Sequence, residues 1–495
     1  MDFASPIETL LQGYANAVCF HCRQQFLVKL LSTSRINGEN YGTNLISGFN
    51  QNRLSHGNST FVTIFTTKPN SAFIRQSLSD TKASVVDLTF PEITHPEIPQ
   101  GVESADKLPS FSLFFSFASL TKLLQPEFDK ILESLQPDVG CIISDVFFPW
   151  SLESASKLNI PRYEFSGCSN FTVAIYDILA IQEFPVDSDD ELFSLAPNFP
   201  NVRLTKNDLE PEIHSQPGEV ADLFTDIYSE TSNGDGIIAN SFYALESQFE
   251  DYLNRETSPP KVWSVGPLCL AAAAKDAYSE NKEKPAWIQW LDEMLYVKKS
   301  VLYVAFGSLA EITIDQFREL ATGLENSGEH FLWVMRYPFE DEFMNEFEER
   351  VKGRGVLVKN QWVDQVEILR HDSVSGFMSH CGWNSVLESI CESVPLLGFP
   401  ITADQYWNAR MVEDYYGVGV KVVTDTGSVG GFFSSECIAN KVKELMNVEG
   451  QKGKEIRENV KKLGEKARSA MEEGGSSWDA LDMFIDQLIC GKKKK

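Results

Sequence analysis

The strongest constraint on the fold is an alternation of short apolar segments with amphipathic helical stretches along most of the chain. The apolar segments are rich in β-branched and aromatic residues, and stretches of helical periodicity separate them, as in residues 123–135 and 314–324. Segments this apolar are typical of parallel strands buried between layers of helices. The sequence therefore predicts an α/β fold with strands in residues 61–67, 85–90, 139–145, 236–242, 301–306, 330–336, 375–380 and 394–399.

The length of the chain predicts more than one domain. With 495 residues, the chain is too long for a single hydrophobic core of ordinary size. The α/β alternation is interrupted between residues 256 and 285 by the sequence TSPP, a run of alanines and a charged stretch, which are typical of a linker. We therefore predict domains over residues 1–260 and 261–476. The residues alone leave open which domain the last helix, 477–490, packs against.

The composition argues against several classes of partner. The 70 acidic residues exceed the 43 basic ones and give a formal net charge of −27, and so acidic a surface repels nucleic-acid phosphates and anionic lipids. No secretion signal and no apolar stretch of about 18 residues is recognisable, which predicts a cytoplasmic protein without a membrane span. The nine cysteines, an odd number, suit reduced thiols better than a disulfide framework.

One segment concentrates chemically active side chains between an apolar run and a helix. Residues 376–388 read GFMSHCGWNSVLE, which is compatible with a Cys/His nucleophile pair, a metal site or a phosphate-binding helix N-terminus. The nucleophile pair is disfavoured because His380 and Cys381 are adjacent, and adjacent side chains of an extended strand point to opposite faces.

A metal site is also disfavoured. Cys19, His21 and Cys22 have the spacing of metal ligands, but no second ligand pair at zinc spacing follows them. Asp187 and Asp189 form an Asp-x-Asp pair within the acidic stretch FPVDSDDELF, where a solvated loop is the better interpretation. We therefore expect no bound metal.

The phosphate-binding hypothesis is the most consistent with the residues. A helix N-terminus offers free N–H donors and the positive end of the helix dipole to an anion. Gly382 allows close approach of the backbone, and His380, Asn384 and Ser385 can add side-chain donors. The sequence from Ser385 to Glu388 also fits a capping box, and these residues alone leave both interpretations open.

The longer segment around these residues favours the phosphate site over the capping box. From Trp362 to Gln405 the chain reads WVDQVEILRHDSVSGFMSHCGWNSVLESICESVPLLGFPITADQ, which closely resembles the signature box of the plant family-1 UDP-dependent glycosyltransferases. Further segments are similar to family blocks in the family order, including NSFYALE (240–246), VWSVGPL (262–268), VLYVAFGS (301–308) and FLWVMR (331–336). The resemblance implies the GT-B fold, in which two Rossmann-like domains face each other across a cleft and the last helix returns to the N-terminal domain.

The resemblance also implies which residues bind the donor. They are Ser308, Trp362, Val363, Gln365, His380, Gly382, Trp383, Asn384, Ser385, Glu388, Asp404 and Gln405. In the family, Trp362 would stack on uracil, with the Val363 backbone and Gln365 beside the base and ribose. Glu388 would accept hydrogen bonds from the ribose hydroxyls.

The remaining donor residues would bind the diphosphate and the sugar. The diphosphate would be held by Ser308, His380, Asn384 and Ser385. Asp404 and Gln405 would bind the sugar hydroxyls, and glutamine at this position indicates glucose. UDP-glucose would be a co-substrate, and no other cofactor is implied. The structural alternatives are that Trp362 and Trp383 are core aromatics and that Asp404 is an N-cap.

The N-terminus departs from the family pattern. In the family, a histidine after the first strand takes the acceptor proton and is oriented by an aspartate, so that transfer inverts the anomeric centre and gives a β-glucoside. Asp145 fits the aspartate, and His21 is the nearest candidate for the histidine. The acceptor would be a small lipophilic alcohol or phenol, such as a flavonoid, in a pocket lined by Phe147, Phe148 and Trp150. The alternative is a UDP-sugar-binding protein with impaired or no catalysis.

Overall fold

The structure is a computed structural model, and it forms two compact units. It describes residues 62–77, 83–92, 95–136, 139–179, 191–195, 197–208, 233–255, 261–270, 284–307, 312–335, 342–424 and 427–491, with residues 223, 226, 227, 229 and 231. Unit 1 takes its described residues from 1–177, 211–273 and 467–495, and unit 2 takes them from 178–210 and 274–466.

Unit 1 is built on parallel strands covered by helices. A four-stranded parallel sheet has the order β3 (Ile142–Asp145), β4 (Arg162–Ser166), β7 (Gly236–Ala239) and β8 (Lys261–Ser264), and a parallel pair comprises β1 (Thr63–Thr67) and β2 (Ser84–Leu88). The helices with residues in unit 1 are α3 (Lys68–Ser77), α4 (Phe114–Leu120), α5 (Gln125–Ser134), α6 (Trp150–Lys157), α7 (Asn170–Leu179), α9 (Tyr243–Leu253) and α18 (Ser476–Gly491). A core cluster that includes Phe65, Phe128 and Ile142 joins β1, α5 and β3.

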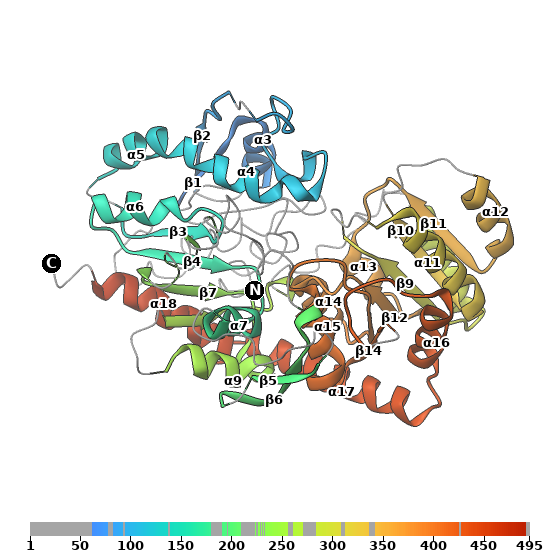
Figure 1. The fold of residues 1–495 in the computed structure, drawn as a ribbon. Helices are drawn as coiled ribbons and strands as arrows, with labels where there is room; N and C mark the ends of the chain where they lie inside the picture. The colour runs from blue at the N-terminus through green and yellow to red at the C-terminus, as the bar shows by residue number, and fades with distance from the viewer. Residues whose placement is uncertain are drawn as a thin grey trace, which may run out of the picture. The chain divides into compact units, whose positions relative to one another are not determined.

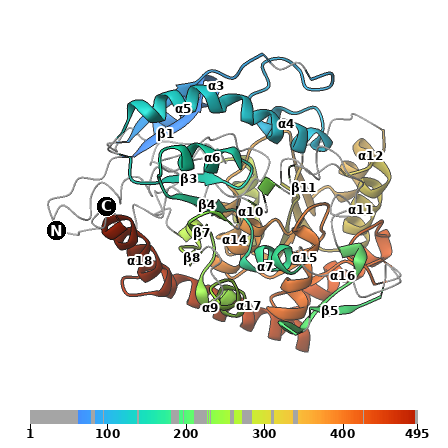
Figure 2. The same cartoon turned by 60° about the vertical axis from the view of Figure 1, so that its left-hand side comes forward.

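The last helix, α18, packs on the sheet of unit 1. The Phe484 ring lies edge-on to Trp263 of β8, with ring centroids 5.3 Å apart, and to Tyr163 of β4 at 4.9 Å. The Ser477 hydroxyl donates a hydrogen bond to the carbonyl of Gly266 at the end of β8. Figures 1 and 2 both show α18 beside the β7–β8 edge. These contacts fix the last helix onto a part of the chain more than 200 residues earlier in the sequence.

Unit 2 contains a six-stranded, all-parallel sheet. Its order is β11 (Gly355–Lys359), β10 (His330–Met335), β9 (Val301–Ala305), β12 (Val374–Ser379), β13 (Leu396–Gly398) and β14 (Gly419–Lys421). Its helices are α10 (Ala286–Tyr296), α11 (Ile314–Ser327), α12 (Glu342–Val351), α13 (Gln365–Leu369), α14 (Trp383–Cys391), α15 (Gln405–Arg410), the π-helix η8 (Met411–Tyr415), α16 (Ser435–Met446) and most of α17 (Gln451–Met471).

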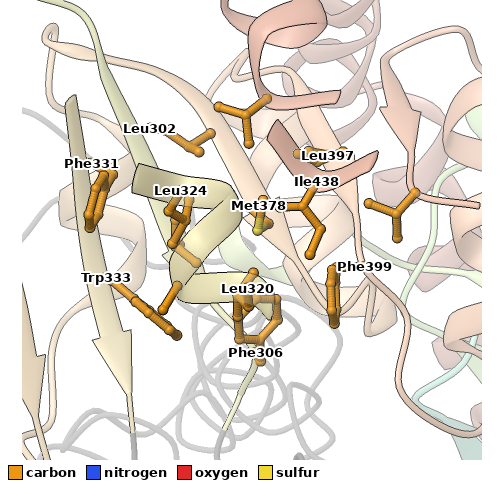
Figure 3. Packing of buried hydrophobic residues seen from close by; sticks show 14 of the residues in the cluster. Leu302, Phe306, Leu320, Leu324, Phe331, Trp333, Met378, Leu397, Phe399 and Ile438 are labelled. Carbon is orange, nitrogen blue, oxygen red and sulfur yellow. The ribbon is translucent and has the colours of Figure 1, made fainter. Parts of the chain in front are cut away.

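Alternation of side chains along the strands separates the two faces of this sheet. On one face, Leu302 of β9 and Met378 of β12 join a core cluster with Leu320 of α11 and Ile438 of α16, as Figure 3 shows. Residues of the other parity, such as Tyr303, project to the opposite face, because successive side chains of a strand alternate. This second face is available to position the polar groups described below.

The strand predictions are confirmed, although they are incomplete. All eight predicted segments contain a strand, and α5 and α11 fall on the predicted helical stretches. The strands β4, β8, β11 and β14 were not predicted, and neither was the antiparallel hairpin of β5 (Phe193–Leu195) and β6 (Phe199–Leu204). Residues 178–210, which include this hairpin, group with unit 2, whereas the sequence predicts one N-terminal domain over residues 1–260.

A buried carboxyl group holds the N-terminus of α7 in unit 1. Glu246 accepts hydrogen bonds from the backbone N–H groups of Asn170 (2.9 Å) and Phe171 (3.0 Å), the first residues of the helix, and from the Ser241 hydroxyl (2.6 Å). The first N–H groups of a helix have no partner within it, so an outside acceptor stabilises its start. Burial raises the pKa of Glu246 to about 7.

We expect Glu246 to make the stability of the protein depend on pH. The pKa is raised from 4.5 in the unfolded chain to about 7 in the folded one, so the folded state binds the proton more tightly. As the pH rises from 4.5 to about 7, the contribution of Glu246 to the free energy of unfolding should fall by about 3 kcal/mol. Above pH 7 this contribution should stay constant. Urea unfolding of the wild type and Glu246→Gln at several pH values measures this difference. A pH-independent difference would contradict the assignment.

Candidate functional site

The candidate site lies at the carboxyl edge of the sheet in unit 2. The chain order of the strands reverses between the neighbouring strands β9 and β12, and α/β proteins bind ligands at such a point. Strand β12 ends at Ser379, and α14 begins at Trp383 after three intervening residues. Cys381 adopts a left-handed conformation (φ 61°), and its N–H donates to the Ser379 hydroxyl (3.1 Å). This tight turn places the start of α14 beside the end of β12.

The N-cap residue of α14 has no side chain that could cap the helix. Gly382 occupies the N-cap position, and Ser385 lies inside the first turn of the helix. The capping-box interpretation of Ser385 and Glu388 is therefore wrong, because Ser385 is not at the N-cap. The N–H groups of the first turn are oriented along the helix axis toward its start, which is the arrangement that binds anions.

His380 lies within this turn as a buried, neutral imidazole. Its side chain is 8% exposed, and burial lowers its pKa to about 4. Within the part of the chain that the structure describes, its Nδ1 atom has no hydrogen-bond partner. A β-carbon added at Gly382 would lie 2.6 Å from His380 Nε2, so glycine is required for the ring to occupy this position.

Cys381 is not suited to be a nucleophile. Its side chain is fully buried, and burial raises the pKa of the thiol well above its ordinary value. A thiol must ionise to act as a nucleophile. The Cys/His nucleophile hypothesis is therefore excluded by the surroundings of Cys381.

Gln365 brings the side chains of two helices together. Its Nε2 donates to Ser385 Oγ (3.0 Å) and Glu388 Oε2 (2.6 Å), both on α14. Its Oε1 accepts a hydrogen bond from the Tyr303 hydroxyl of β9 (3.3 Å), and the Tyr303 ring is stacked on Phe377 of β12 at 4.8 Å. The first residue of α13 is thus fixed against α14 by a rigid aromatic residue of the sheet.

The two tryptophans of the signature box, residues 362–405, have different surroundings. Trp362, in the segment between β11 and α13, is 46% exposed, whereas its neighbour Val363 is buried. Trp383, the first residue of α14, is buried together with Asn384. An indole that is nearly half exposed, three residues before Gln365 in the chain, is suited to stack on a planar ligand.

Asp404 and Gln405 lie at the start of α15. Asp404 occupies the N-cap position without a side-chain cap, and its Oδ2 accepts from Asn408 Nδ2 (3.0 Å), which also donates to the Cys381 carbonyl (3.1 Å). Gln405 Oε1 accepts from the N–H groups of Ile401 (2.9 Å) and Thr402 (3.0 Å). The amide nitrogen of Gln405 is therefore the group oriented for donation to a ligand.

Two residues that hold this arrangement, Tyr303 and Asn408, were not predicted from the sequence. Tyr303 lies within a strand that is otherwise apolar, and its hydroxyl is the signal that it needs a polar partner when buried. Asn408 lies four residues after Asp404, which is the spacing of neighbours on a helix face.

Asp145 belongs to unit 1, at the carboxyl end of β3. Its Oδ1 accepts from the N–H of Phe147 (3.0 Å), and Arg162 Nη2 donates to its carbonyl (3.5 Å). The side chains of Phe148 and Trp150 are buried in the core cluster of this unit. Phe147 is half-buried and lies 4.8 Å from the Phe114 ring.

Several residues predicted from the sequence fall outside the described residues. These are Cys19, His21, Cys22, Asp187, Asp189 and Ser308. Among the residues that are described, no three His, Cys, Asp or Glu side chains are grouped so as to hold a metal ion. In the same part of the chain, no helix combines the length and the apolar character needed to cross a membrane.

Comparisons with known proteins agree on the class. Residues 284–465 match the family model described as UDP-glucoronosyl and UDP-glucosyl transferase. The chain is 46% identical over 438 residues to UDP-glycosyltransferase 90A1 of Arabidopsis thaliana, covering 86% of this chain and 89% of the relative. It is 32% identical over 460 residues to UDP-glucose flavonoid 3-O-glucosyltransferase 7 of Fragaria ananassa, covering 88% and 91%.

A solved structure extends the agreement to the fold. The crystal structure of Glycyrrhiza uralensis UGT73P12 complexed with glycyrrhetinic acid 3-O-monoglucuronide is similar with a TM-score of 0.77 and 30% identity, covering 91% of this chain and 94% of that one. The chain has two Rossmann-like units, and in unit 2 a helix N-terminus lies at the carboxyl edge of a parallel sheet. Together with the solved structure, these features define a glycosyltransferase of the GT-B fold. The chain belongs to the plant family-1 UDP-glycosyltransferases, as the sequence resemblance predicted, and is an enzyme of that family.

We expect His380 to contribute to the acid sensitivity of the protein. Its pKa is lowered from 6.5 to about 4 in the folded state, so the unfolded state binds more protons between these values. The free energy of unfolding should therefore fall by up to about 3 kcal/mol as the pH decreases from 6.5 to 4. The free energies of unfolding of the wild type and of His380→Gln should converge at low pH, because the variant lacks the imidazole that takes up a proton on unfolding. Equal acid sensitivity would show that His380 is not buried in its neutral form.

Proposed function

We propose that this UDP-glycosyltransferase transfers glucose from UDP-glucose to a hydroxyl group of a small lipophilic acceptor, such as a phenol or flavonoid. Transfer inverts the anomeric centre and gives a β-glucoside. The observation that carries the proposal is the joining of Gln365, Ser385 and Glu388 beside the start of α14. The name of the Fragaria ananassa relative, a UDP-glucose flavonoid 3-O-glucosyltransferase, supports the choice of donor and acceptor.

The nucleoside part of the donor fits the group formed by α13 and α14. The partly exposed indole of Trp362 would stack on uracil, with the Val363 backbone beside it. Glu388 would accept hydrogen bonds from the ribose hydroxyls, since a carboxylate can accept from two donors. Gln365 already donates to Glu388 and would keep this carboxylate oriented when the ribose is bound.

The diphosphate fits the turn between β12 and α14. His380, whose Nδ1 has no partner among the described residues, would donate to a phosphate oxygen with the first-turn N–H groups of α14. Asn384, Ser385 and Ser308 would add side-chain donors. These donors stabilise the negative charge that develops on UDP as it leaves, without a metal ion. Gly382 would allow the phosphates to approach the backbone closely.

The sugar would be bound at the start of α15. Asp404 would accept hydrogen bonds from sugar hydroxyls, and the amide nitrogen of Gln405 would donate to a neighbouring oxygen. The carbonyl oxygen of this amide is engaged by two backbone N–H groups, which supports a fixed orientation. An epimer that misplaced one hydroxyl would leave a buried polar group unpaired, at a cost of about 1 to 3 kcal/mol.

The N-terminal domain, residues 1–260 with the helix 477–490, would bind the acceptor and supply the base. Residues 261–476 would bind the donor. A base takes the proton of the acceptor hydroxyl as its oxygen attacks the anomeric carbon. The bond from this carbon to the diphosphate oxygen breaks on the opposite face, and UDP leaves with the electron pair. His21 is the proposed base, and Asp145 would accept its second N–H and stabilise the imidazolium.

A turnover assay with a panel of phenols and flavonoids tests the function. We expect β-glucoside formation from UDP-glucose, with a kcat/KM for UDP-galactose lower by about fivefold to 150-fold because of the unpaired group. Calorimetry should show that UDP binds equally well with and without EDTA, since the proposed partners of the diphosphate are hydrogen-bond donors.

Each alternative gives a different result in these assays. UDP-glucose binding without turnover of any acceptor would favour a UDP-sugar-binding protein with impaired catalysis. Equal kcat/KM for UDP-glucose and UDP-galactose would contradict the glucose preference. Loss of UDP binding in EDTA would contradict the metal-free diphosphate site.

Substitution of the proposed base and its partner separates catalysis from binding. His21→Ala should lower kcat by about a hundredfold or more, with UDP affinity nearly unchanged, because the base does not contact the donor nucleotide. Asp145→Ala should lower kcat less, because a histidine without its partner can still accept a proton. If His21→Ala retains normal turnover, this histidine is not the base.

A further inference from the structure

A buried ion pair anchors the short helix that carries Asp404 and Gln405. Arg410, the last residue of α15, donates from Nε to Asp208 Oδ2 (2.8 Å) and from Nη2 to Asp208 Oδ1 (3.2 Å). Asp208 is the last residue of the 3-10 helix η5 (Lys206–Asp208), which follows the β5–β6 hairpin. The two residues are 202 positions apart in the sequence, and both belong to unit 2.

The pair is desolvated and held on both sides. Asp208 is 0% exposed, and its Oδ2 also accepts from the N–H of Thr205 (2.6 Å). Arg410 is 7% exposed, and its Nη2 also donates to the Gly427 carbonyl (3.3 Å). Stability alone does not require such a pair, because well-packed apolar residues often serve equally well. The two-pronged geometry instead fixes the guanidinium in one position and orientation.

The helix α15 depends on this anchor because it is short and irregularly connected. Its six residues span about 9 Å, which is far below the length at which a helix is stable alone. Ala403, just before the helix, has a left-handed conformation (φ 57°), and the π-helix η8 follows Arg410 directly. Arg410 therefore fixes the end of the helix, as Asn408 fixes its start through the Asp404 side chain and the Cys381 carbonyl.

We propose that Asp208 and Arg410 are positioning residues for recognition of the sugar in the donor. Through α15 they hold Asp404 and Gln405 where these side chains meet the sugar hydroxyls. The inference rests on the proposed function, in which these two residues bind the sugar. The sugar can be distinguished from the nucleotide, because the proposed UDP-binding residues other than Ser308 lie on α13, α14 and the segments before them, and none lies on α15.

Calorimetry with UDP and UDP-glucose on the full chain tests the inference. Asp208→Asn removes the charge with little change in shape, and Arg410→Lys keeps the charge but loses the two-pronged contact. For both variants we expect UDP-glucose to bind about tenfold more weakly, with the affinity for UDP within about twofold of the wild type. The discrimination between UDP-glucose and UDP-galactose in kcat/KM should decrease in parallel.

A buried pair in unit 1 provides a control for the removal of a buried charge. Arg162 Nη1 lies 3.7 Å from Glu164 Oε2, with both side chains almost fully buried. Glu164→Gln repeats the change of a buried acid to its amide far from the proposed sugar-binding residues in the sequence. Arg162 is left unchanged because it also donates to the carbonyl of Asp145. We expect this control to lower the melting temperature without changing the ratio of the two affinities.

The outcomes separate this inference from the proposed function. If the Asp208 and Arg410 variants weaken UDP and UDP-glucose equally, or change neither affinity, the positioning role is wrong. Should Asp208→Asn fail to fold, Arg410→Lys decides the question alone, since it retains a cation in the buried site. A wild type that does not bind UDP-glucose would overturn the proposed function and this inference together. Normal wild-type binding with unchanged ratios in the variants would overturn only this inference.

Discussion

The site depends on a turn of three residues between β12 and α14. The chain must leave a buried strand and start a helix at once, and it does so with Cys381 in a left-handed conformation and Gly382 at the N-cap. A side chain at residue 382 would collide with His380, and a longer turn would move the helix away from the sheet. The start of α14, the ring of His380 and the side chains on α14 are all positioned by this turn.

Buried or partly buried polar side chains join sequence-distant segments in both units. Glu246 binds the start of α7, Gln365 joins β9, α13 and α14, and Asp208 holds the end of α15. A buried polar group is costly unless its partners are in place, so each of these contacts favours one arrangement over nearby alternatives. Apolar packing holds the layers together, and these polar contacts determine the precise positions of the functional side chains.

The sequence predicts the apolar framework well because its strands follow a simple pattern. The predicted segments are continuous apolar runs, whereas β4 carries Arg162 and Glu164, which are buried against each other. A charged pair within a buried strand cannot be recognised until both residues are known to be neighbours. The strands β11 and β14 lie at the edges of their sheet and are less apolar, so their signal is weaker. The signature box predicts the site residues. It does not predict that Gly382, rather than Ser385, occupies the N-cap position of α14.

The hairpin β5–β6 has a consequence for any attempt to exchange the two halves of such an enzyme. It precedes residue 260 in the chain, yet the short helix η5 that follows it supplies the carboxylate that neutralises Arg410 in unit 2. A chimaera joined at the linker would therefore inherit the arginine from one parent and its buried counterion from the other. If the parent that supplies the first half lacks an acid at the position of Asp208, the guanidinium loses its two-pronged carboxylate contact in a buried site, and removal of one partner of a buried pair costs about 3 to 5 kcal/mol. Compatibility at this position, and not only at the linker, determines which parents can be combined.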